Sequence, residues 1–116
     1  MTVKTFTSLV RMSAEEDFRQ VGAELADLGV WISTMMGRPA LKDRDGKVFA
    51  SLRPDGAMVF RLVRDTAEHA AALELDGASL FDPSGSGRVV KDWVVVPHTW
   101  AGQWTDLAEA AHSRPR

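Results

Sequence analysis

Two short turn sequences in the middle of the chain constrain its fold more than any other feature. Asp45-Gly46 favours a two-residue β-hairpin turn, because both central positions of that turn need positive φ, which glycine accepts freely and aspartate tolerates. Pro54-Asp55-Gly56 indicates a second turn, since proline fixes φ and glycine relieves the strained position. The flanking alternation predicts strands over residues 32–36, 40–43, 47–52 and 57–63. The centre of the chain is therefore expected to be an antiparallel meander.

Helical spacing predicts helices before and after this meander. Ser13 and Glu16 form a capping box, and apolar residues then recur at helical spacing up to Gly29, so we expect a helix over residues 14–28. Asp65 indicates the start of a second helix, and Thr99 can cap a third. The later elements are expected over residues 65–75 (helix), 93–97 (strand) and 99–113 (helix). This order of elements predicts an α+β domain.

The length and composition are those of one globular domain. The chain has 116 residues, 45% of them hydrophobic, so a single domain over residues 1–116 is expected to fold without a metal or disulfide. It contains no cysteine, which excludes thiolate ligands and a cysteine nucleophile. No apolar run suits a signal peptide or a membrane span, so we expect a cytoplasmic protein without a membrane partner. Residues 1–12 are a poorly assigned N-terminal extension.

Positive charge is concentrated in the meander of an acidic chain. The net charge is −2, yet residues 38–64 contain seven Lys and Arg against three Asp and Glu. Alternation directs Val48, Ala50 and Leu52 to the core, which predicts an aromatic ring among bases on the opposite face. The candidate binding residues on that face are Arg38, Lys42, Lys47, Phe49, Arg53 and Arg61.

The sequence lacks the residue patterns of an enzyme. His69, His98 and His112 lie far apart and match no metal-ligand spacing. No nucleophile stands beside a base, and no carboxylate pair has a recognisable spacing. We therefore expect no enzymatic activity, no metal and no cofactor.

Two further features allow a ligand interpretation. The loop S-G-S-G-R at residues 84–88 can present backbone N–H groups to an anion, with Arg88 and Lys91 nearby. It lacks the spacing of a P-loop, which favours a simple mobile connector. The tryptophans suggest base stacking, but their apolar neighbours favour core packing for all four: Trp31, Trp93, Trp100 and Trp104.

The run from Gly29 to Leu52 has the form of a family signature. It reads G-V-W-I-S-T-M-M-G-R-P-A-L-K-D-R-D-G-K-V-F-A-S-L, and a short helix, a W-V-x-V strand and a terminal helix follow in order. In these features the chain resembles the MmcQ/YjbR-like proteins. The resemblance implies a CyaY-like α+β fold, related in shape to frataxin, with helices on one face of an antiparallel sheet. It also implies DNA binding through hairpin wings. Residues 1–12 and the Ala111-His112-Ser113 end depart from the family pattern.

Two kinds of partner remain open for the basic face. A non-enzymatic DNA-binding accessory domain would contact phosphates, so its binding would be weak and salt-sensitive. A protein-interaction or self-association module, with another protein or a second copy of the chain (a homodimer) as its partner, would use Phe49, Val59 and Val63 as an apolar centre within an arginine rim. Overall acidity and the aspartates at 43, 45 and 55 favour the second hypothesis.

Overall fold

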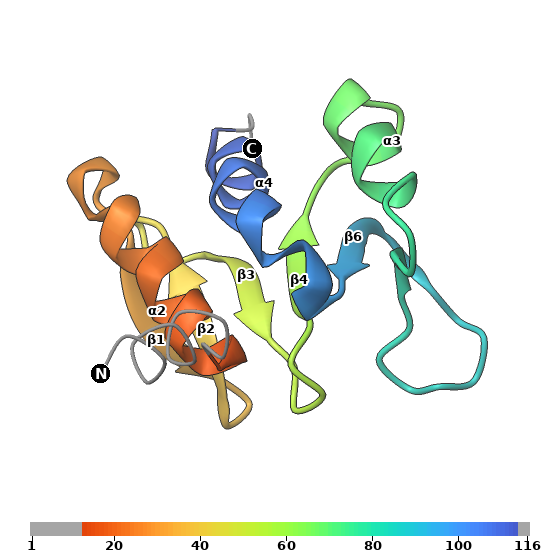
Figure 1. Cartoon of the computed structure of the whole chain (residues 1–116), viewed down its shortest axis with the longest axis horizontal. Coiled ribbons are helices and arrows are strands. Elements are labelled where there is room, and N and C mark those ends of the chain that lie inside the picture. The colour runs from red at the N-terminus through yellow and green to blue at the C-terminus, as the bar shows by residue number, and fades with distance from the viewer. Residues whose placement is uncertain (1–12, 114–116) are drawn as a thin grey trace, which may run out of the picture.

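The computed structural model describes residues 13–113 and shows an α+β fold (Figure 1). The strands are β1 (Trp31–Met35), β2 (Arg38–Lys42), β3 (Val48–Leu52), β4 (Met58–Arg61), β5 (Ser79–Phe81) and β6 (Val90–Val96). The helices are α2 (Ala14–Glu24), α3 (Ala67–Leu73) and α4 (Ala101–His112), with 3-10 turns η1 (Ala26–Leu28) and η2 (His98–Trp100). The strands form one sheet in the order β1-β2-β3-β4-β6-β5, and every neighbouring pair is antiparallel. The three described α-helices lie on one face of it.

Helix α2 starts where the capping box predicts. Ser13 Oγ accepts a hydrogen bond from the Glu16 amide at 3.1 Å, and the Glu16 carboxylate accepts one from the Ser13 amide at 2.9 Å. These bonds satisfy two amide groups that the first turn of a helix otherwise leaves unpaired. The α-helix ends at Glu24, before the predicted residue 28, because the chain tightens into η1 and turns at Gly29 with φ +86°.

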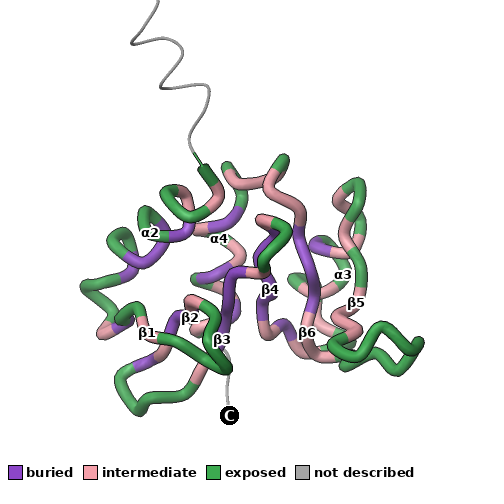
Figure 2. The backbone as a smooth tube through the Cα atoms, turned by 90° about the horizontal axis from the view of Figure 1, so that it is seen from below, coloured by how far each residue is buried: buried purple, intermediate pink, exposed green. Residues whose placement is uncertain are grey.

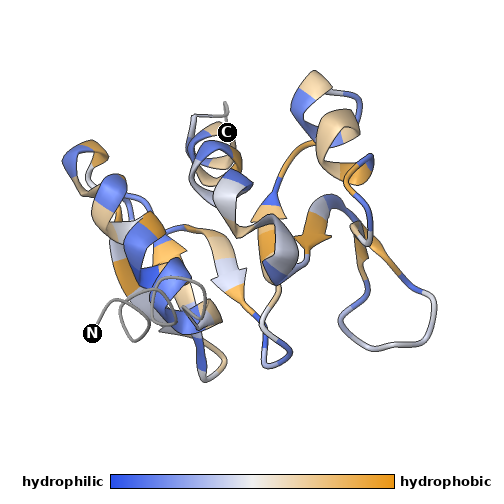
Figure 3. Ribbon diagram, viewed as in Figure 1, coloured by the Kyte–Doolittle hydropathy of each residue, from blue (hydrophilic) through white to orange (hydrophobic). Residues whose placement is uncertain are grey.

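The main core lies between the sheet and the helices. Leu41, Ala50, Phe60 and Val94 form one row of paired residues across the four central strands, and all are fully buried. Trp104 of α4 is also fully buried and packs in the same cluster. Figure 2 shows that the buried residues follow the central strands and the inner faces of the helices, and Figure 3 shows polar residues at the loops. Complete burial of each large apolar side chain stabilises the fold by about 1.5–3 kcal/mol.

Phe49 overturns part of the predicted face assignment. Consecutive β2 residues, Leu41 and Lys42, pair with Ala50 and Val48, so Phe49 is an extra residue in β3. Such a β-bulge interrupts the alternation of side chains along a strand. Phe49 is therefore only 3% exposed, belongs to the helix-side core, and packs against the last turn of α4. The prediction that Phe49 lies on the face away from the core is wrong.

Other differences concern the ends of elements. Thr66 caps α3 by accepting a hydrogen bond from the His69 amide at 3.2 Å, while Asp65 occupies the preceding turn with φ +69°. Helix α4 follows the 3-10 turn η2 and has no Thr99 cap. Strand β5 is absent from the sequence predictions, and β6 begins at Val90, three residues earlier than predicted. Val63, assigned to the binding face, lies beyond the end of β4.

Candidate functional site

The sheet face opposite the helices is the candidate site, and we call it the open face. Val59 of β4 pairs with Ser51 of β3 and Val95 of β6 on this face. Val59 and Val95 belong to a second apolar cluster, against which Phe81 and Trp93 pack. This cluster contains no residue of α2, α3 or α4, which pack into the main core on the other side (Figure 1).

Alternation along the strands places four of the predicted basic residues on the open face: Arg38, Lys42, Arg53 and Arg61. Arg53 is paired with Asp55 at 2.9 Å, which offsets its charge. Lys42 Nζ lies 5.4 Å from the ring centroid of Trp31, within the range of a cation–π contact. Trp31 is 47% exposed, so its assignment to core packing is wrong. Lys47 is exposed in the β2–β3 turn, at the other end of the sheet from Arg53.

A hollow of about 320 Å³ opens on this face. Its lining includes Met35, Met36, Phe81 and Pro83 as apolar groups, and Arg38 and Arg53 as cations; we call it the open-face hollow. A smaller cavity of about 100 Å³ continues past Met35 and Phe81 to Val90 and Trp93. Strands β1 and β5 are opposite edges of the sheet, so a hollow lined by both means that the sheet curls around it. The larger cavity is lined by both arginines and by Asp82, whereas the smaller one has no charged residue in its lining, so one end is charged and the other is mainly apolar.

The β1–β2 turn places an exposed methionine beside this hollow. Met36 and Gly37 have φ values of +53° and +80°, as a two-residue hairpin turn of type I′ requires. Glycine adopts this conformation readily, whereas a non-glycine residue such as methionine is held there at a cost of order 1 kcal/mol or more. Met36 is nevertheless 95% exposed. A strained and exposed apolar side chain contributes little to folding, so binding is the better explanation for it.

Backbone N–H groups of the loop that joins β5 to β6 donate hydrogen bonds to a side chain of the same loop. The Asp82 carboxylate accepts hydrogen bonds from the amides of Gly85 at 3.0 Å and Gly87 at 2.8 Å. Two of the N–H groups that could bind an external anion, those of Gly85 and Gly87, therefore already donate to the Asp82 carboxylate of the same loop. Arg88 and Lys91 are exposed, and the Lys91 carbonyl oxygen lies 2.8 Å from a ring nitrogen of a histidine in α3.

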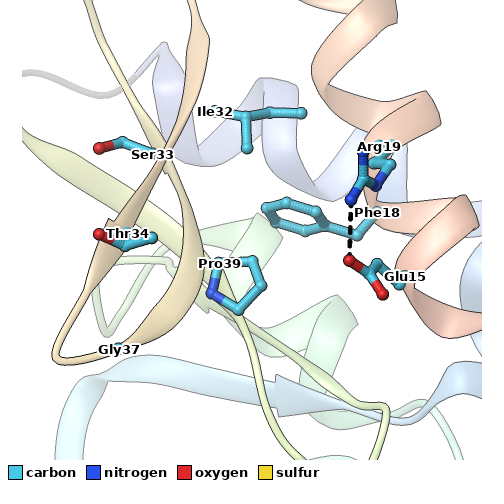
Figure 4. A pocket seen from close by; sticks show the side chains of 8 residues that line it. All are labelled: Glu15, Phe18, Arg19, Ile32, Ser33, Thr34, Gly37 and Pro39. Atoms are coloured by element: carbon cyan, nitrogen blue, oxygen red, sulfur yellow. Dashed lines mark hydrogen bonds and ion pairs between the residues drawn. The ribbon is translucent and has the colours of Figure 1, made fainter.

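A separate pocket of about 260 Å³ lies on the helix side, between α2 and the β1–β2 hairpin (Figure 4). Phe18, Ile32 and Pro39 converge in it, and an ion pair of 2.9 Å between Glu15 and Arg19 lies on its α2 side. Ile32 remains 45% exposed although it packs against α2. This pocket borders the outer strand β1 and does not share the open face.

The histidines do not assemble a metal site in the described structure. His98 Nε2 lies 2.6 Å from Asp17 Oδ2, and this pair ties η2 to α2. His69 and His112 belong to α3 and α4. Within residues 13–113, no three His, Cys, Asp or Glu side chains are placed to hold a metal ion together. Over the same residues, no helix has both the length and the apolarity needed to cross a membrane.

Comparisons with known proteins add no relative from which a function could be transferred. The chain matches no protein-family model, no curated protein and no solved structure. The function is therefore inferred from the side chains described above.

Sequence patterns alone do not identify several residues that line the open-face hollow and the smaller cavity. Met36 was predicted to end a strand, although the following Gly37 is a signal for a two-residue turn. Phe81 lies in a strand of only three residues, which periodicity does not detect. Trp93 was assigned to the core because an apolar run follows it, but it is partly exposed beside the smaller cavity.

Proposed function

We propose that this protein is a non-enzymatic protein-interaction module that binds an apolar segment of its partner in the open-face hollow. The main support for this proposal is that one hollow combines Met35, Met36 and Phe81 with Arg38. Methionine side chains adapt to partners of different shape, and arginine and aromatic residues are enriched in protein interfaces. The preferred segment is extended, with an apolar side chain for the smaller cavity and a carboxylate for Arg38.

The loops support this function because they collect at the same end of the sheet. The β1–β2, β3–β4 and β5–β6 connections all project in one direction (Figure 1). Met36 stands on the first, Asp55 on the second and Pro83 on the third. Binding surfaces are commonly formed by loops that a rigid scaffold positions in this way.

The same arrangement of loops, together with the sequence signature between Gly29 and Leu52, supports our proposal that the chain is an MmcQ/YjbR-like protein with a CyaY-like fold.

A peptide display library tests the protein-interaction function. We expect the full chain to select peptides with an apolar residue beside Asp or Glu, and these peptides to shift the NMR methyl signals of Met35 and Met36. Met36→Asp should weaken binding at least about tenfold, since it places a carboxylate where an apolar group binds. Gln103→Asp is the matched control, because it adds the same charge at an exposed position of α4. Peptides that leave both methyl signals unchanged would contradict the proposal.

DNA binding through the open face is the second candidate function. The observation that favours it is the alignment of Arg38, Lys42, Arg53 and Arg61 on one face. The burial of Phe49 removes the aromatic ring assigned to sugar or base contact, and the pairing of Arg53 with Asp55 reduces the net charge. Four phosphate contacts would give a slope of log K against log salt of about −3.6, from about −0.9 per phosphate.

Salt titration of binding to duplex DNA tests this candidate. Arg61→Ala should reduce the magnitude of the slope by about 0.9 and weaken binding to all sequences alike. Because Arg61 is not among the residues that line the open-face hollow, this variant should leave peptide binding unchanged. An absence of affinity for DNA at low salt would eliminate the candidate.

A further inference from the structure

The outer edge of β1 is an unprotected strand edge in the described structure. Among residues 13–113, β1 has β2 as its neighbour and occupies the end of the sheet. Soluble proteins usually protect such edges with charged residues, proline, bulges or very short strands. The sequence Trp-Ile-Ser-Thr-Met contains no charge and no proline, and its pairing with β2 is regular over all five residues. The opposite edge strand, β5, is only three residues long, is irregularly paired and is followed by Pro83.

Exposed apolar side chains accompany this free edge. Trp31 is 47% exposed, Ile32 45% and Met35 36%. Trp31 and Met35 lie on the open face, while Ile32 lies on the helix side beside the pocket of Figure 4. Within residues 13–113, this edge therefore combines backbone groups that no neighbouring strand pairs with exposed apolar surface, which is the combination that a further strand would cover.

We propose that β1 pairs with β1 of a second copy of this chain, in an antiparallel and two-fold symmetric arrangement centred on Ser33. This surface adjoins the open-face hollow and shares Met35 with it, but the proposal does not depend on the function proposed for that hollow. A homodimer with this symmetry uses the same patch on both subunits, so the patch must be complementary to itself. The register centred on Ser33 is the one that pairs all five residues of both strands.

The side chains of β1 satisfy that requirement. In this register Ile32 of one copy lies opposite Thr34 of the other copy. Thr34 lines the helix-side pocket formed by Phe18 and Pro39, so the apolar end of Ile32 from one copy covers this pocket of the other copy. Trp31 lies opposite Met35, a pair of a type in which the sulfur and the ring attract. No charged side chain meets another within the ten paired residues, because β1 has none. A partner segment with charged residues would lose this match, which is why we choose a second copy as the occupant.

Cysteine crosslinking tests both the dimer and its register. Ser33→Cys introduces the chain's only cysteine, and residues directly opposite in an antiparallel pair have Cα atoms about 4.5–5.5 Å apart, within disulfide range. Thr34→Cys is the control, because two residues at position 34 are then roughly 8 Å apart, beyond the ~7 Å limit for a disulfide. We expect the Ser33→Cys full chain to form a covalent dimer at least about tenfold faster than Thr34→Cys under mild oxidation. Equal rates for the two variants would overturn the register.

Sedimentation equilibrium of the unmodified full chain tests the association itself. We expect a concentration-dependent monomer–dimer equilibrium that Thr34→Lys shifts toward monomer at least about tenfold, because lysine on an edge strand opposes pairing. Gln103→Lys, on α4, should leave the equilibrium unchanged. A chain that stays monomeric up to its solubility limit would overturn the proposal, as would a dimer that is insensitive to Thr34→Lys. Circular dichroism of each variant verifies that it is folded.

Discussion

Truncation of Phe49 to alanine distinguishes a core residue from a binding residue. The Phe49 side chain is 3% exposed, so its removal leaves a cavity between β3 and the end of α4. Phe→Ala changes in protein cores cost about 3–5 kcal/mol. Part of that cost is the edge-on contact with His112, whose ring centroid is 5.3 Å from that of Phe49, since such ring pairs contribute about 0.5–1.5 kcal/mol. Domains are stabilised by only about 5–15 kcal/mol, so the loss is a large fraction of the total.

Urea denaturation followed by tryptophan fluorescence measures this loss. With a denaturant slope of about 1.5 kcal/mol per molar, the midpoint should fall by roughly 2–3 M. His112→Ala, alone and combined with Phe49→Ala, gives a double-mutant cycle whose coupling should be about 0.5–1.5 kcal/mol. Met36→Ala is the control, because a side chain that is 95% exposed should contribute within about 0.5 kcal/mol. A loss below about 1 kcal/mol for Phe49→Ala would refute the bulge and its consequence for side-chain direction.

Two further predictions concern stability. The side-chain hydrogen bond from Arg64, with a backbone bond from the same residue, lowers the pKa of Asp92 below its ordinary value of 3.8, so this carboxylate stabilises the fold above that value. This contribution to stability is lost as pH falls through the folded-state pKa of Asp92. Asp92→Asn should therefore lower the free energy of unfolding at neutral pH and have the same free energy of unfolding as the parent in strong acid. A difference in urea midpoint that does not change with pH would contradict this. Gly102→Ala in α4 should stabilise by about 0.5–1 kcal/mol, because nothing lies within 4 Å of the added methyl group. Gly22→Ala in α2 should show no such gain in thermal unfolding, because its methyl group would lie 2.8 Å from Ile32; equal gains would show that Ile32 moves aside freely.

Local turn chemistry explains why the meander was predictable. The turn at Asp45-Gly46 depends on its own residues, and the structure adds that the Asp43 carboxylate accepts hydrogen bonds from the amides of Asp45 and Lys47. The capping box at Ser13 is equally local. The α+β class follows from such signals, and the structure confirms it.

Features that depend on pairing between strands were not predictable in this way. The bulge at Phe49 is a mismatch between β3 and β2, and the sequence of β3 alone reads as regular alternation. The exposure of Trp31 and Ile32 follows from the position of β1 at the edge of the sheet, which their apolar character does not indicate. The open-face hollow brings together two opposite edges, so residues as distant in sequence as Met35 and Phe81 become neighbours only when the sheet curls.

Because three hairpin loops cluster at one end of the sheet, their sequences can vary with little effect on the stability of the fold. Residues 83–88 of the last loop are exposed, and the main core contains none of them. Doubling the length of a flexible loop costs only about 0.6 kcal/mol in closure entropy. Insertions and substitutions in these loops could therefore accumulate in descendants of this protein, or be introduced by an engineer, without loss of the folded scaffold. New binding specificities could then be selected at that end while the helix-side core stays the same.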